Sequence, residues 1–203
     1  LVRSRGLGDV YKRQAVILLG TILLCLPVSA ADGKSVYWLD ALFTATTSVC
    51  VTGLVTVPTA TTWSTFGKIV ILGLIQFGGL GIMACLTMVF LILRRKISLQ
   101  SRKLIQDTYN LPVLKGSVGI VRKLLIGTAA VELAGAFFYS FWFVPEYGFW
   151  KGIGYSLFHS VSAFCNAGID LVGESSFAPF VTNPLINFTT MGLIFLSLSL
   201  IHI

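Results

Sequence analysis

Four long apolar runs constrain the fold of this 203-residue chain more than any other feature of its sequence. A helix needs about 20 mainly apolar residues to cross about 30 Å of hydrocarbon, and each run approaches or exceeds that length. Charged residues make up only 11% of the chain, so few of its side chains oppose burial in lipid. We therefore expect an all-α membrane protein. The runs are Ala15–Ala31, Ile69–Leu93, Leu124–Val144 and Leu185–Ile203.

A short segment between the first two runs returns, without a gap, between the last two. The copies are Leu42–Leu54 and Leu157–Ile169, and Leu, Phe, Cys and Gly coincide at four places. Each copy is too short and too polar to span a bilayer, although it lies between two runs that can. The order of spanning helix, short helix, loop and spanning helix thus occurs twice, which predicts a tandem duplication.

Within each copy the pattern predicts a short helix followed by an irregular loop. In the first copy we expect the helix to end near Thr47 and the chain to be extended over Ser48–Leu54. In the second we expect Gly152 and Gly154 to precede a helix that continues to about Ser162, followed by a loop over Ala163–Leu171. Irregular backbone at membrane depth must be buried in protein or line a wet cavity, and a pore provides such a cavity.

The composition of the loops favours coordination by the backbone. Inward-facing carbonyl oxygens can replace the water shell of a dehydrated monovalent cation. Gly53 and Gly168 can adopt the positive φ that such carbonyls require. Because Val49–Leu54 contains no carboxylate, the loop suits K+ better than Ca2+. The alternative is that each repeat is a re-entrant packing motif in another kind of transporter.

The positive charge of the chain is concentrated between the two units. Eight Lys and Arg residues and one acid, Asp107, lie between Arg94 and Lys123. By the positive-inside bias this loop is cytoplasmic, so both short repeats are expected to face outward. We expect no nucleic-acid binding, because the cluster is held between two spanning helices.

The chain divides accordingly into four parts. Residues 1–14 are expected to be extraneous or disordered, and a signal peptide is the alternative interpretation of the start. A first pore unit follows at 15–93, then the basic cytoplasmic linker at 94–123. A second pore unit occupies 124–203 and is truncated at its last helix.

The cysteines and histidines show no spacing typical of a zinc site. We expect plain buried thiols, a structural role for His159, and no transition-metal site. A membrane enzyme that uses Cys50 and Cys165 as thiols is a distant alternative, since neither has an activating base nearby. The four cysteines are Cys25, Cys50, Cys85 and Cys165.

Two further features lie within the spanning runs. Glu132 is in the middle of the third run, where a lipid-facing charge costs at least about 2.5 kcal/mol, so it should face the protein interior or be protonated. It is either a hydrogen-bond acceptor behind the pore helix, a simple packing contact, or part of a cation pathway. The second run is rich in glycine, which permits either close helix packing or a hinge. These glycines are Gly73, Gly78, Gly79 and Gly81.

Two stretches resemble a known family. Residues 39–84, with Val51-Thr52-Gly53-Leu54 and Gln76-Phe77-Gly78-Gly79-Leu80-Gly81, resemble the first pore unit of the Trk/Ktr/HKT superfamily of potassium transporters. Phe158–Leu171 is similar to the second unit, above all to that of the bacterial Ktr-type membrane subunit (KtrB-like). The chain departs from the family at Cys165, where Asn is common, and at Ser197-Leu198-Ser199, where a Gly-rich segment is expected.

The resemblance implies tandem helix–pore loop–helix units in a pseudo-fourfold, potassium-channel-like architecture, of which this chain holds two. One glycine from each unit lines the filter, here Gly53 and Gly168. K+ is then the transported substrate, bound by backbone carbonyls, with Na+ as a coupling or activating ion and no covalently bound cofactor; the chain is not an enzyme. Carbonyls come from Val51, Thr52, Leu54, Asn166, Ala167 and Ile169, and support from Cys50, Cys165 and Glu132.

The resemblance also implies partners and a location. These are pore units three and four of the same full-length chain, a second copy in a homodimer, a cytoplasmic nucleotide-binding regulatory subunit, and the bilayer of a bacterial plasma membrane. Na+-dependent K+ uptake is the expected function. A channel-like or Na+-transporting member of the superfamily and a non-conducting membrane scaffold remain as alternatives.

Overall fold

The computed structural model describes residues 2–81, 85, 117–173 and 176–202, and every regular element among them is a helix. Backbone pairing between segments is limited there to one isolated bridge, between Ala30 and Trp63. The prediction of an all-α chain is therefore confirmed for the described residues. The helices are α1 (Val2–Cys25), α2 (Trp38–Cys50), α3 (Thr59–Thr62), α4 (Thr65–Gly79), α7 (Ser117–Tyr147), α8 (Phe149–Phe164) and α9 (Pro184–His202), with 3-10 turns η1 (Pro27–Ser29) and η2 (Ala178–Phe180).

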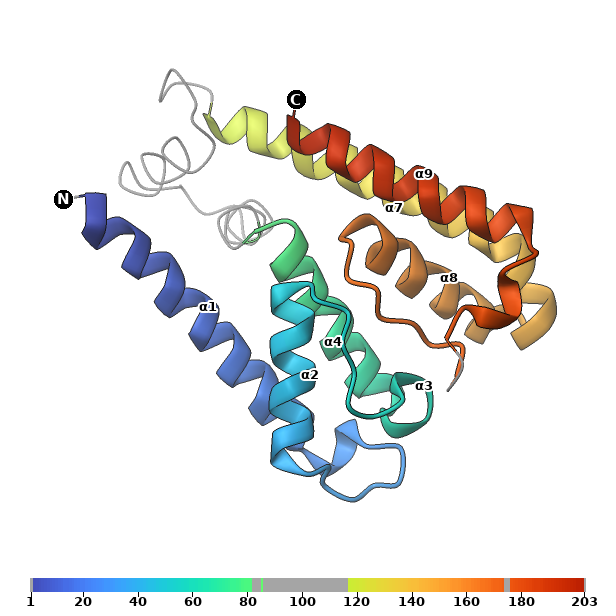
Figure 1. Ribbon diagram of the computed structural model, residues 1–203, viewed down its shortest axis with the longest axis horizontal. Coiled ribbons are helices and arrows are strands. Elements are labelled where there is room, and N and C mark those ends of the chain that lie inside the picture. Colours follow the sequence, from blue (N-terminus) through green and yellow to red (C-terminus); the bar gives the residue numbers. More distant parts are fainter. Residues whose placement is uncertain (1, 82–84, 86–116, 174–175, 203) are drawn as a thin grey trace.

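The helices form two units of the same order. Helices α1, α2 and α4 make up the first, and α7, α8 and α9 the second (Figure 1). In each unit a short helix, α2 or α8, packs against longer ones, and the loop that follows it turns toward the other unit. The duplication is thus visible in the fold, whereas a pseudo-fourfold arrangement stays a prediction.

The short helices are longer than the sequence pattern predicts. Helix α2 continues to Cys50, so the prediction that it ends near Thr47 is wrong. The side chains of Thr47, Ser48 and Val49 are buried, and the Ser48 hydroxyl donates to the Thr44 carbonyl at 2.6 Å within the helix. Burial of these side chains favours another helical turn over an extended strand.

Helix α8 begins at Phe149 and ends at Phe164, so it includes two glycines that we expected to precede it. Of these, Gly152 lies where a Cβ would come within 2.5 Å of the Val144 Cα on α7. Its role is therefore close packing between α7 and α8 and not helix termination.

The second apolar run, Ile69–Leu93, does not form one described helix. Helix α4 ends at Gly79, and Gly81 has a φ of 82°, in the left-handed region that glycine tolerates. Of the residues from 82 to 116, only Cys85 is described, so most of the predicted linker 94–123 lies outside the described residues. Helix α7 begins at Ser117, and the last residues of that linker are therefore helical.

The first helix extends further back than the first apolar run. Helix α1 begins at Val2 and ends at Cys25, so most of the segment 1–14 is continuous with the helix of the first unit. That residues 1–14 are extraneous stays a prediction.

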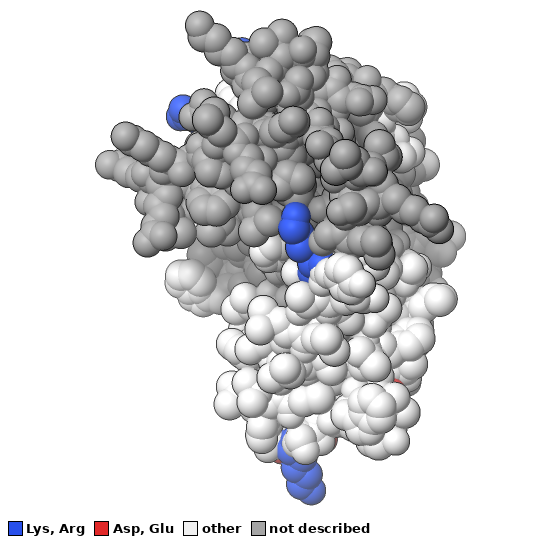
Figure 2. All heavy atoms as spheres, turned by 90° about the vertical axis from the view of Figure 1, so that its left-hand side faces the viewer, with Lys and Arg blue, Asp and Glu red and all other residues white. Residues whose placement is uncertain are grey.

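The outer surface is apolar where the helices are long. Val118–Tyr147 is long and apolar enough to cross a membrane, and two shorter apolar helices are Thr65–Gly79 and Pro184–Ser199. Figure 2 shows a face on which few of the described atoms belong to charged residues. A bilayer accommodates such surfaces better than water does.

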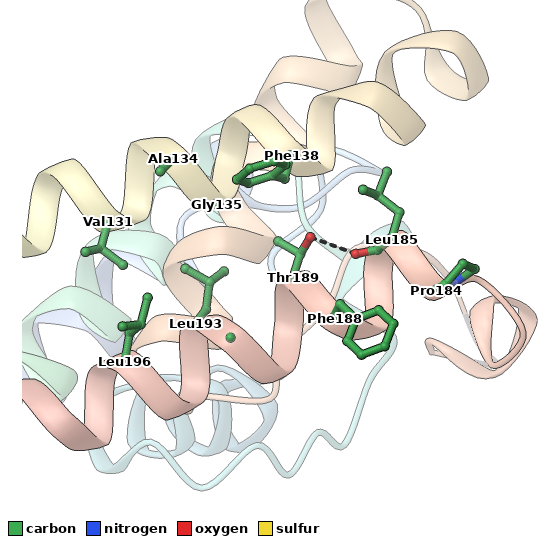
Figure 3. A pocket seen from close by; sticks show the side chains of 11 residues that line it. Val131, Ala134, Gly135, Phe138, Pro184, Leu185, Phe188, Thr189, Leu193 and Leu196 are labelled. Carbon is green, nitrogen blue, oxygen red and sulfur yellow. Dashed lines mark hydrogen bonds between the residues drawn. The ribbon is translucent and has the colours of Figure 1, made fainter.

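Helices α7 and α9 also enclose an apolar groove of about 610 Å³ (Figure 3). Its lining includes Phe138 from α7 and Leu185 and Phe188 from α9, and none of its residues is charged. Large side chains elsewhere on α7 are exposed as well, with Leu133 at 62% and Phe137 at 60%. Both features agree with a membrane protein.

Candidate functional site

The two short helices end in the same backbone conformation. Val51 has a φ of 56° and Asn166 a φ of 58°, each directly after the Cys that the repeats share. One residue later, the Thr52 amide donates to the Thr47 carbonyl at 3.1 Å, and the Ala167 amide donates to the Ser162 carbonyl at 2.8 Å. This hydrogen bond across a left-handed residue is typical of a helix C-terminus. The repeat is therefore one of conformation as well as sequence.

Gly53 and Gly168 occupy matching places after these turns. Their φ angles are 75° and 69°, so both need the conformation that a side chain disfavours. A Cβ on Gly53 would lie 2.7 Å from the Ala167 carbonyl oxygen and 3.5 Å from the Gly168 Cα. A Cβ on Gly168 would lie 3.6 Å from the Gly53 Cα. The two loops thus meet backbone to backbone between the units (Figure 1).

A hydroxyl at matching positions of the two short helices holds each loop. Thr47 Oγ1 accepts from the Leu54 amide at 3.1 Å and shares a hydrogen bond of 2.6 Å with Thr52 Oγ1. The Ser162 hydroxyl donates to the Ile169 carbonyl at 2.6 Å. The Ile169 carbonyl therefore faces its own helix, whereas Ile169 was expected to supply a carbonyl to an ion.

A small cavity lies beside the glycines. Its volume is about 260 Å³, and its wall includes Gly53, Gly168 and the carboxylate-bearing Asp170. Asp170 accepts a hydrogen bond from the Val172 amide at 3.0 Å and another from the Ser176 hydroxyl. An acidic side chain thus lies at the edge of the site, held by its own loop. The other lining residues are Val55, Thr56, Val57, Pro58, Thr59, Ile169, Gly173 and Ser176.

His159 anchors the second loop from within α8. Its Nδ1 lies 2.7 Å from the Tyr155 carbonyl oxygen, and its Nε2 lies 3.2 Å from the Leu171 amide nitrogen. A carbonyl only accepts and an amide only donates, so the ring is neutral and carries its proton on Nδ1. The ring also stacks on Phe143 with 4.9 Å between ring centroids. These contacts agree with the structural role expected of His159.

Comparison with known proteins identifies the family. The model of a family described as "TrkH: Cation transport protein" matches residues 8–198. The chain belongs to this family. The resemblance to Trk/Ktr potassium transporters is thereby confirmed, and membership of a transporter family agrees with the expectation that the chain is not an enzyme.

Individual relatives of this TrkH-family chain are bacterial. It is 43% identical over 163 residues to the potassium/sodium uptake protein NtpJ of Enterococcus hirae. The matched residues make up 80% of this chain and 36% of that protein. It is 42% identical over 171 residues to the Ktr system potassium uptake protein B of Bacillus subtilis, covering 84% of this chain and 38% of that protein. The chain therefore spans less than two fifths of the length of either relative.

The predicted supporting residues of the TrkH-family chain divide into two kinds. Cys165 is buried and its thiol donates to Gln76 Oε1 at 3.2 Å, whereas Cys50 is exposed at the end of α2. The expectation of a buried thiol is therefore wrong for Cys50, because its position follows the last buried turn of α2. Glu132 is buried, as its place in an apolar run requires, and it accepts hydrogen bonds from Gln76.

Gln76 is the residue of this site that sequence reasoning missed. It was noted only as the start of a glycine-rich motif, with no role of its own. The sequence did contain a signal for this contact. The side-chain amide of Gln76 and the carboxyl group of Glu132 each lie within an apolar run, where each needs a polar partner.

Proposed function

We propose that this chain supplies two pore units of a bacterial K+ uptake protein, with Val51–Leu54 and Asn166–Ile169 as two segments of one selectivity filter. The observation that carries the proposal is the meeting of Gly53 and Gly168. Two loops of matching left-handed conformation approach each other so closely that a Cβ on Gly53 would overlap the Ala167 carbonyl oxygen. Gly168 is constrained instead by its φ of 69°, which a side chain disfavours. A packing motif alone does not need two such backbones to face one another at the end of two short helices.

The chemistry at this place suits a monovalent cation. The C-terminal ends of α2 and α8 lead into the loops, and each such end carries about half a negative charge. Backbone carbonyls are the ligands that replace the water shell of K+ in filters. Because the Ile169 carbonyl is bonded to Ser162, we assign ion contact in the second loop to Asn166, Ala167 and Gly168.

The proposal extends to the complete protein. Two further units of the full-length chain would complete a pseudo-fourfold filter, and the assembly would be a homodimer that binds a cytoplasmic nucleotide-binding subunit. Na+ would couple to or activate uptake of K+. The relatives support this assignment, since one is named a potassium/sodium uptake protein and another a Ktr system potassium uptake protein.

The membrane topology follows from the charge pattern. Residues 94–123 would lie in the cytoplasm and both glycine loops would face outward, in a multi-pass protein of the plasma membrane. The apolar surface of α7 supports the membrane location.

Cells that lack other K+ uptake systems provide the test. The full-length protein should restore their growth at low external K+, and Gly53→Ser or Gly168→Ser should reduce the preference for K+ over Na+ while the protein remains in the membrane. Gly154→Ser is the matched control, because a Cβ on this α8 glycine meets nothing within 4 Å. Failure of the wild-type protein to restore growth, or unchanged ion preference in both filter variants, would refute the proposal.

A further inference from the structure

Gln76 connects the two units directly behind the second loop. It lies on α4 of the first unit, three residues before Gly79. Its Nε2 lies 3.0 Å and 2.8 Å from the two carboxylate oxygens of Glu132, on α7 of the second unit. Its Oε1 lies 3.2 Å from Cys165 Sγ, at the end of α8. One side chain thus contacts both an outer helix and a filter loop of the neighbouring unit.

The partners determine the orientation of the Gln76 carboxamide. The Gln76 NH2 group only donates hydrogen bonds, and both carboxyl oxygens of Glu132 lie within reach of it as acceptors. The carbonyl oxygen of the carboxamide then faces the Cys165 thiol, which can donate to it. Glu132 therefore acts on Cys165 through Gln76, and the chain of donors and acceptors has one consistent direction.

The surroundings leave this network little freedom. Glu132 is 6% exposed and Cys165 is 7% exposed. A Cβ on Gly79 would lie 2.5 Å from Cys165 Sγ, so α4 presses directly on the residue before the loop. The Ser160 hydroxyl of α8 also donates to the backbone carbonyl of Glu132 at 2.5 Å. Hydrogen bonds in such a buried, low-dielectric place are strong and specific in geometry.

Cys165 lies directly before the left-handed turn of the second loop. The next residue is Asn166, with its φ of 58°, and the filter glycine Gly168 follows two residues later. A displacement of Cys165 would consequently move the carbonyls that we assign to ion contact. Because a filter discriminates between ions of similar size by the placement of its oxygens, a small shift matters more for selectivity than for folding.

We infer that Gln76 is a positioning residue through which the first unit sets the geometry of the second filter loop, with Glu132 orienting its carboxamide. The inference rests on the proposed function, because its readout is ion selectivity. It assigns a specific task to two polar residues that lie outside the loops themselves, Gln76 and Glu132.

The experiment compares K+ and Na+ uptake by variants of the full-length protein in the cells described above. Gln76→Leu and Cys165→Ala should each displace the carbonyls that follow Cys165 and reduce the K+ to Na+ uptake ratio by about tenfold, which corresponds to about 1.4 kcal/mol of lost discrimination between the two ions. Cys165→Ser and Glu132→Gln keep a donor and an acceptor, and their ratios should stay within about twofold of wild type. Glu146→Gln, an exposed acid on the same helix α7, is the matched control.

A double variant separates positioning from folding. Gln76→Leu alone leaves a buried carboxylate without a partner and should lower the amount of protein in the membrane. Adding Glu132→Leu replaces both partners by apolar groups and should restore that amount, because paired replacement is nearly neutral for stability. The K+ to Na+ ratio should nevertheless stay low, since Cys165 still lacks its acceptor.

The outcomes distinguish the inference from the proposed function. If the wild-type protein discriminates K+ from Na+ and the double variant is abundant with wild-type selectivity, the inference is wrong while the function stands. The same conclusion follows if Cys165→Ala keeps the wild-type ratio. If the wild-type protein transports neither ion, it is the proposed function that fails.

Discussion

Individual polar side chains hold the two loops in place. Thr47 and Ser162 bind their own loops through hydroxyls, and His159 binds the Leu171 amide beyond the second glycine. The backbone at Val51 is strained instead of being held by a polar side chain. A β-branched residue rarely adopts a positive φ, and such strain costs about 1–3 kcal/mol. The conformation persists at Val51 where the surrounding packing enforces it, with α4 close by at Gly78.

His159→Phe should destabilise the second loop. Phenylalanine can still stack on Phe143, but it leaves the buried Leu171 amide without an acceptor, which costs about 1–3 kcal/mol. Denaturant titration of the purified protein in detergent measures the free energy of unfolding. Tyr155→Phe is the control, because it removes only a hydroxyl and keeps both the ring and the backbone carbonyl that His159 contacts. Equal stability of the two variants would contradict the assigned role of His159.

Among the helices, α4 carries a glycine-rich motif in which some glycines allow close packing and another allows a left-handed backbone conformation. Gly79 packs against Cys165, and Gly78 packs so tightly on the end of α2 that a Cβ would overlap the Val49 carbonyl. These contacts favour the packing interpretation of the glycine-rich run. Gly81 instead adopts a left-handed φ where α4 has ended, and Gly73 has open space around its Cα. Sequence alone could not distinguish the four glycines, since their roles depend on neighbours from distant segments.

Gly79→Leu should therefore prevent the units from packing. The added side chain would overlap Cys165, and overpacking of this kind costs about 1–3 kcal/mol or more. We expect a loss of folded protein from the membrane, measured by size-exclusion chromatography of the tagged protein in mild detergent. Gly73→Leu on the same helix should assemble normally. Assembled Gly79→Leu protein with altered conductance would support a hinge at this glycine instead.

The helix boundaries also divide into those that the local sequence predicts and those that depend on packing against distant segments. The apolar runs predicted α7 and α9 because long helices show in composition. They did not predict the end of α2 at Cys50, since the buried turn from Thr47 to Val49 is stabilised by packing against other helices. The pairing of Gly53 with Gly168 was predictable from the repeat, whereas the contacts of Gln76 were not, because its partners lie far away in the sequence.

In the molecule as a whole, the two units depend on each other. Loop meets loop at the glycines, and Gln76 of the first unit contacts Glu132 and Cys165 of the second. The chain spans less than two fifths of the relatives that it matches, so a complete pore would contain further segments. Its orientation in the membrane can be tested with single substitutions at positions within this chain.

Thiol labelling in intact cells measures that orientation. In a full-length protein without Cys50, Lys151→Cys at the start of α8 should react with a membrane-impermeant maleimide from outside. Lys103→Cys in the basic segment should react only after the membrane is permeabilised, because positive segments stay in the cytoplasm. The reverse pattern would show that the glycine loops face the cytoplasm.

The most direct test of the central claim is the ion preference of the purified full-length protein in proteoliposomes. The K+ to Na+ uptake ratio is measured for the wild-type protein, Gly168→Ser and the control Gly154→Ser. We predict that Gly168→Ser lowers the ratio by about tenfold, equivalent to about 1.4 kcal/mol, while Gly154→Ser retains the wild-type value. A wild-type ratio in a folded Gly168→Ser protein would contradict the assignment of this loop to the filter.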